Sequence, residues 1–160
     1  MKSYRILVLA AVLVAVALPA LAAETAVNLS IFPPIATAKE EDSVTAFRFN
    51  LIYGKNASVR VVDLGLVNET TTGLSKGLAL GFVNLADADF TGLQFGGVNV
   101  VGGNFEGFEW GFVNYTKNAR GLQLGFVNYT ETLYGVQIGL VNIIKKPGFM
   151  PVFPFVNWSF

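Results

Sequence analysis

The sequence predicts an all-β fold, a repeat β-solenoid of about eight coils with 14–16 residues each. The first observation behind it is a unit of the form Gly-Leu-Gln-Leu-Gly-Phe-Val-Asn, which recurs at a steady period over about two thirds of the chain. Five copies are close: Gly77–Asn84, Gly92–Asn99, Gly107–Asn114, Gly121–Asn128 and Gly135–Asn142. Looser copies lie at Ala46–Tyr53, Val61–Asn68 and Met150–Asn157.

The second observation is the alternation inside each unit. We number positions backwards from its terminal Asn, which is position 0. Positions −6, −4 and −2 are mostly large and apolar, while position −5 is mostly polar and position −3 is mostly Gly. A period of two with aromatic and β-branched enrichment indicates a strand. We expect the apolar columns to form the core, so Phe112→Asp should unfold the protein and Gln123→Ala should scarcely alter its stability.

The third observation is that near-identical units favour in-register stacking, in which like residues form ladders along the stack. The alternative is a small antiparallel up-and-down β-barrel with one strand per repeat. The ending Val156, Trp158, Phe160 resembles the terminal signal of outer-membrane barrels. However, three alternate apolar residues cover roughly 14 Å, against the ~25 Å band that a barrel needs. The solenoid is therefore preferred, as a rod of about 38 Å.

The N-terminal segment Met1–Ala22 has the features of a secretory signal peptide. Lys2 and Arg5 precede an apolar stretch, and Ala20-Leu21-Ala22 forms a small-residue cleavage site. The chain is therefore expected to be exported, to the periplasm, the outer membrane or the cell surface.

The rest of the chain divides into two parts. Segment 23–43 is expected to hold one strand, Val27–Phe32, stopped by Pro33-Pro34 and followed by a linker or cap. Segment 44–160 is the β-repeat domain. Within it we expect turns near the terminal Asn and at the Gly of position −7, where the backbone needs positive φ or close approach.

Composition excludes several kinds of chemistry. The chain has no Cys and no His, which removes the thiolate ligands and the usual general base. The formal net charge is +0, and no basic patch points to nucleic acid. We therefore expect a protein that is not an enzyme and that uses no metal or other cofactor.

The candidate binding residues form a ladder at position −5: Gln94, Glu109, Gln123 and Gln137. If exposed, this flat polar face could contact a protein or glycan surface or a second copy of the chain. The same residues could instead serve only to stabilise the stack. In the same column, Arg48 and Asp63 are expected to be neighbours on successive coils. Membrane contact is expected only in the barrel alternative.

The run Gly-Leu-Gln-Leu-Gly-Phe-Val-Asn-Tyr at 121–129 resembles the bacterial surface-repeat family of leptospiral type. The resemblance covers about 44–157 and departs at Gly97, where a large apolar residue is usual. It implies an exported, envelope-associated protein and supplies no catalytic residues. The expected function is that of a non-enzymatic envelope or surface repeat protein with a structural or binding role, the alternative being a small outer-membrane barrel protein.

Overall fold

The computed structural model describes residues 22–146 and 149–160. The predicted signal peptide therefore lies outside the described residues, apart from Ala22. All regular elements described are strands: β1 (Glu24–Phe32), β2 (Ile35–Ala36), β3 (Ser43–Asn56), β4 (Ser58–Thr70), β5 (Ser75–Leu80), β6 (Val83–Ala86), β7 (Phe90–Phe95), β8 (Val98–Trp110), β9 (Val113–Leu124), β10 (Val127–Ile144) and β11 (Val152–Ser159).

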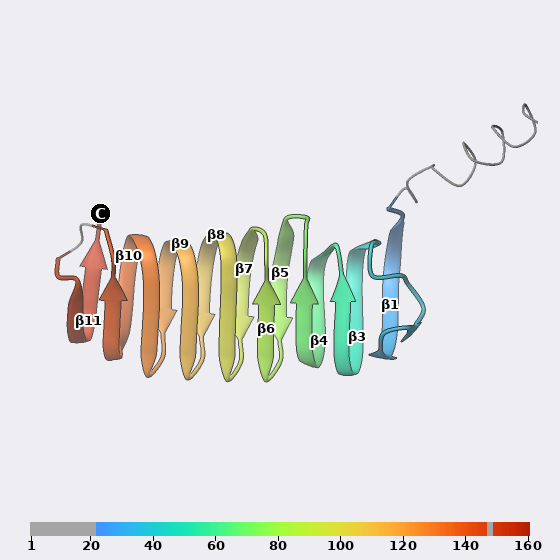
Figure 1. Ribbon diagram of the computed structural model, residues 1–160, viewed down its shortest axis with the longest axis horizontal. Helices are drawn as coiled ribbons and strands as arrows, with labels where there is room; N and C mark the ends of the chain where they lie inside the picture. Colours follow the sequence, from blue (N-terminus) through green and yellow to red (C-terminus); the bar gives the residue numbers. More distant parts are fainter. Residues whose placement is uncertain (1–21, 147–148) are drawn as a thin grey trace, which may run out of the picture.

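These strands wind into a β-solenoid of about eight turns, as the sequence predicts (Figure 1). Successive coils pair in parallel and in register, so that Asn99 lies beside Asn114 and Gly107 beside Gly121. This parallel pairing contradicts the barrel alternative, which requires antiparallel neighbours. Each coil has two arms: a descending arm at positions −9 to −4 and an ascending arm at positions −1 to +2.

The turns lie elsewhere than the sequence suggested. One turn joins the arms at positions −3 and −2, and the other follows position +2. The turn expected near the terminal Asn thus lies two to three residues before it. The turn expected at the −7 Gly is wrong, because this Gly lies inside a strand, as in β5, although it has the expected positive φ. The Gly at −3 makes the turn, and its N–H bonds along the solenoid axis, as from Gly111 to the Leu124 carbonyl at 3.0 Å.

This two-residue turn determines what faces inward. It breaks the alternation, so positions −5 and 0 both point into the coil, while positions −4, −2 and −1 point outward. Phe112 is accordingly 57% exposed and Gln123 is 1% exposed. The expectation that the −4 and −2 columns form the core is wrong, and with it the reasoning behind the Phe112→Asp and Gln123→Ala predictions.

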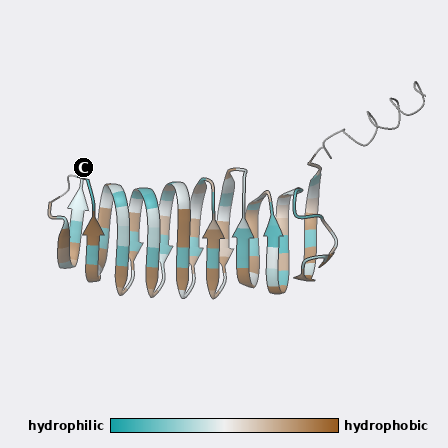
Figure 2. Cartoon of the chain, viewed as in Figure 1, coloured by the Kyte–Doolittle hydropathy of each residue, from teal (hydrophilic) through white to brown (hydrophobic). Residues whose placement is uncertain are grey.

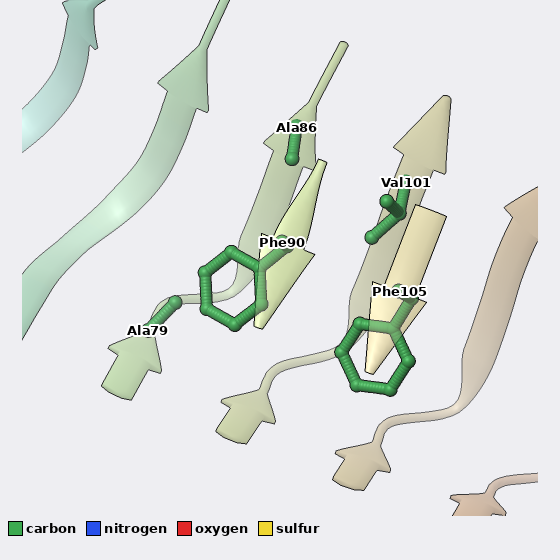
Figure 3. Packing of buried hydrophobic residues seen from close by; sticks show 5 residues of the cluster. All are labelled: Ala79, Ala86, Phe90, Val101 and Phe105. Atoms are coloured by element: carbon green, nitrogen blue, oxygen red, sulfur yellow. The ribbon is translucent and has the colours of Figure 1, made fainter. Parts of the chain in front are cut away.

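A narrow, mainly apolar core fills the other end of the coil interior, mostly at positions −9 and +2, where Ser75, Thr116 and Thr130 are also buried. Its larger cluster contains Phe90 and Phe105, whose rings stack with centroids 6.1 Å apart, together with three small side chains (Figure 3). Those three are Ala79, Ala86 and Val101. A second cluster of Ala119, Leu133 and Ile144 continues it toward the C-terminus. The interior is thus apolar toward one turn and polar toward the other.

Glycine is required at position −7, although for a reason other than a turn. Gly107 has φ 143°, and a Cβ on it would lie 1.9 Å from the Gly92 carbonyl oxygen of the preceding coil. The same φ region and close approach recur at this position in the neighbouring coils. The repeated glycine therefore lets adjacent backbones approach closely inside the descending arm.

The two ends depart from the repeat. The predicted strand Val27–Phe32 is confirmed within β1, which joins the stack in parallel with β3. The expected eighth copy, Met150–Asn157, is wrong as a coil, since β11 runs antiparallel to β10 and Asn157 pairs with Gln137. The first copy is also shifted, because Gly54, not Tyr53, pairs with Asn68.

Candidate functional site

The four predicted ladder residues are brought together but lie inside the solenoid. Gln94, Glu109, Gln123 and Gln137 are 1%, 0%, 1% and 0% exposed. Gln137 Nε2 donates to Gln123 Oε1 at 2.8 Å, and Gln123 Nε2 donates to Glu109 Oε2 at 2.6 Å. The in-register ladder is therefore found, with hydrogen bonds along Glu109, Gln123 and Gln137. The exposure that a binding face would need is absent, and the alternative in which these residues stabilise the stack fits the contacts. A partner in solvent cannot reach these side chains.

The first rungs of this column form an ion pair. Arg48 Nε donates to Asp63 Oδ1 at 2.8 Å and Nη2 donates to Asp63 Oδ2 at 2.7 Å, so the predicted neighbours meet in a bidentate contact. Burial raises the pKa of the Asp63 carboxyl, and the Arg48 guanidinium opposes that shift. Arg48 Nη1 also donates to the Glu69 carbonyl oxygen at 2.8 Å. Asn28 of β1, which pairs in register with Arg48, continues the polar interior toward the N-terminus.

Glu109 stands where its neighbours carry amides. Thr116 Oγ1 donates to its Oε1 at 2.7 Å. Burial raises the pKa of Glu109 to about 7, and the hydrogen bonds from Thr116 and Gln123 only partly oppose this. Gln94, on the preceding coil, has an Oε1 without a hydrogen-bond partner among the described residues. If the Glu109 carboxyl group is protonated, its hydroxyl can donate a hydrogen bond. Such a donor is what the unpartnered Gln94 Oε1 needs.

The asparagine column holds the turn between the arms. Asn114 Nδ2 donates to Asn128 Oδ1 at 2.8 Å and to the Leu124 carbonyl oxygen, at position −4 of the next coil, at 3.0 Å. Asn68, Asn84, Asn99 and Asn128 make the same pair of contacts. These asparagines therefore have a structural role, which they perform from inside the ascending arm.

The outside of this turn is where the apolar side chains gather. We call positions −4 to −1, running along the solenoid from β5 to β10, the apolar edge; it is the predominantly brown lower edge in Figure 2. Its outermost side chains, at position −2, are more than half exposed: Phe82 64%, Phe112 57%, Phe126 57% and Leu140 60%. Gly97 interrupts this column, and the Phe82 ring lies beside it.

A groove of about 700 Å³ runs along the C-terminal half of the apolar edge. Its walls are the side chains at positions −4 and −2, among them Trp110, Phe112 and Phe126. Its floor is the glycine column at −3, and Phe155 with Val156 of β11 line its end. None of the described residues that line it carries a charge. The volume falls within the range typical of ligand sites.

The sequence contained a signal for this surface. In a strand that alternates, neighbouring residues do not both belong to the apolar face. The repeated Phe-Val pair, as at Phe126-Val127, is apolar at two successive positions and follows a Gly. Taken together, these residues indicate a turn at Gly125 that reverses the inward face.

Comparisons with known proteins give no match from which the role of this surface could be inferred. No protein-family model matches the chain, and neither does any curated protein or solved structure. Among the residues that the structure describes, no helix is long and apolar enough to cross a membrane. Within 22–146 and 149–160, no group of three or more His, Cys, Asp or Glu side chains could hold a metal ion.

Proposed function

We propose that the protein is an exported, non-enzymatic repeat protein of the cell envelope, and that its binding role belongs to the apolar edge. The observation that carries this is a row of exposed aromatic and aliphatic side chains that recurs from β5 to β10 and is interrupted at Gly97. Soluble monomers rarely expose large contiguous apolar patches, and those that exist usually mark interaction sites. The predicted leader and the resemblance to the leptospiral-type surface repeats support export to the envelope.

The polar ladder has a structural part in this proposal. The amides of the ladder and of the asparagine column form hydrogen bonds between adjacent coils inside the rod. The outward positions are therefore not needed to stabilise the interior. In repeat proteins each unit contacts only its neighbours, and the extended surface is what binds. A glycan or protein that recognised Gln94, Glu109, Gln123 or Gln137 directly would have to open the solenoid.

Expression of the full chain in a Gram-negative host, followed by fractionation, tests the proposal. We expect the exported protein in the envelope fraction, and the variant Phe112→Ser/Phe126→Ser in the soluble exported fraction. Both substituted side chains are 57% exposed, so the fold should persist. The matched control is Tyr134→Ser/Phe160→Ser, which removes two exposed aromatic rings away from the apolar edge. Wild-type protein that stays in the cytoplasm would contradict the proposal.

A further inference from the structure

We infer that the partner of the apolar edge is the surface of a lipid bilayer, into one leaflet of which the edge inserts. This rests on the proposed function, since it names what the same surface binds. The inference is carried by how apolar, aromatic and charged side chains are layered above the edge, and by the shape of the apolar surface.

The layering follows the two arms upward from the turn. Positions −4 and −1 come first, and positions −6 and +1 come next. From β5 to β10, position −6 holds Leu78, Leu93, Phe108, Leu122 and Val136, and position +1 holds Leu85, Val100, Tyr115, Tyr129 and Ile143. Three residues of strand separate position −6 from the turn, which is about 10 Å. Interfacial segments bury their apolar faces to roughly 5–10 Å.

Charged side chains begin only above this depth. Along the described residues from β5 to β10, outward positions −6 to +1 carry no charge. Position −8 then holds Lys76, Glu106 and Arg120, and position +3 holds Asp87, Lys117, Glu131 and Lys145. The molecule is thus divided into an uncharged edge and an opposite charged edge. This distribution complements a hydrocarbon layer under a wet headgroup region.

Tyrosines mark the boundary between the two zones. Tyr115 and Tyr129 stack on the ascending arms with ring centroids 4.7 Å apart, and Lys145 Nζ lies 5.8 Å from the Tyr129 ring centroid. Tyr and Trp are enriched at the level where membranes meet water, because their rings are apolar with one polar atom. Here they stand at position +1, directly below the charged positions.

The backbone at the turn is suited to hydrocarbon. The carbonyl oxygens of Phe95, Trp110 and Leu124 each accept two hydrogen bonds, one from a position −3 N–H and one from an asparagine amide. Backbone groups must be satisfied within the protein wherever lipid replaces water. A glycan or an extended peptide would find no free donor or acceptor at these carbonyls. Acyl chains would fill the 700 Å³ groove without needing any.

The shape of the surface favours a bilayer over a second copy of the chain. The apolar residues continue from the descending arm around the turn to the ascending arm, so the surface is convex. A second rod could lie against only one of the two arms. It would leave the position −2 phenylalanines and the other arm in water. Fluid hydrocarbon can cover both arms and the position −2 phenylalanines at the same time.

Flotation with phosphatidylcholine vesicles tests the inference directly. The exported protein, purified in mild detergent and then diluted with vesicles, should float with them and should still float in high salt, because the inserted part is uncharged. Phe112→Ser/Phe126→Ser should lower the bound fraction at least about tenfold, and Tyr134→Ser/Phe160→Ser should leave it nearly unchanged. Every variant shares one N-terminus, so any leader left in place affects all of them equally.

Fluorescence separates insertion from adsorption. Trp110, at position −4, is 55% exposed, and Trp158→Phe leaves it as the single tryptophan of the chain. Lipids brominated on their acyl chains should quench it when the protein is bound. Absent quenching, or release by salt, would overturn insertion. Wild-type protein that ignores vesicles yet stays in the envelope fraction would overturn the lipid partner and leave the proposed function standing.

Discussion

Glu109 is a buried carboxyl group between the buried amides of Gln94 and Gln123. Its side chain is 0% exposed, and its contacts are a hydroxyl and an amide, with no cation supplying charge compensation. Burial raises the pKa of Glu109 to about 7 from an ordinary value of 4.5. The folded protein therefore holds this proton over a pH range in which the unfolded chain has already released it.

This gives a pH dependence of defined sign. Stabilisation from the neutral carboxyl is fully present below about pH 4.5 and is lost as pH rises through about 7. The free energy of unfolding should fall by on the order of 3 kcal/mol across that range from this group alone. In Glu109→Gln the fall should disappear, and that variant should be the more stable one at pH 8. Denaturant unfolding of both proteins from pH 4 to 8 measures how the free energy of unfolding depends on pH. Parallel pH profiles for the wild type and the variant would show that Glu109 is not the group responsible.

At the scale of the strand and turn, the stability of the coil depends more on the buried asparagines than on the phenylalanines. Asn128 accepts from Asn114 Nδ2 and donates to Asn142 Oδ1 and to the Ile138 carbonyl oxygen. Removing this amide leaves the buried Asn142 Oδ1 without its partner, and it takes one of two hydrogen bonds from both Asn114 Nδ2 and the Ile138 carbonyl oxygen. By contrast, the Phe126 side chain next to the turn is mostly in solvent.

We therefore expect Asn128→Ala to destabilise the fold by about 2–4 kcal/mol. Asn118→Ala is the matched control from the same coil. Asn118 makes similar amide contacts, to Asn104 and Thr132, at the solvent-exposed turn, where water can replace them. Its loss should cost less than about 1 kcal/mol. Thermal and denaturant unfolding compare the two; equal losses would show that the column contributes no more than a surface ladder.

The same turn explains what could and could not be predicted from the sequence. The period gave the stacking, the ladders and the contact of Arg48 with Asp63, because in-register coils place like positions together whatever the shape of one coil. The inward face depended on two residues, as at Gly125-Phe126, which end one strand and start another. If these two residues are interpreted as part of one continuous strand, the alternation places the phenylalanines inside the coil and Gln123 outside it. β11 was misplaced because its sequence keeps the repeat, whereas the strand runs antiparallel to β10.

At the scale of the whole molecule, the usual distribution of polar and apolar groups is partly reversed. Amides, a carboxyl and an ion pair occupy one half of the interior, and only the other half is an apolar core. Such an interior is stable because the parallel stack supplies most of these polar side chains with a partner one coil away. Meanwhile, aromatic rings line the outside at the apolar edge. An apolar surface of this kind is unfavourable in water, so we expect something other than water to cover that edge.

This leads to a prediction about the protein without lipid. In detergent-free buffer the apolar edge can be shielded only by other copies, so the wild type should self-associate, increasingly with concentration. Phe112→Ser/Phe126→Ser should shift the population toward monomer, whereas Tyr134→Ser/Phe160→Ser should not. Light scattering coupled to size exclusion, over a concentration series with and without detergent micelles, gives the masses. A wild type that remains monomeric at every concentration without detergent would mean that the edge tolerates water, and the case for a hydrocarbon partner would lose its thermodynamic basis.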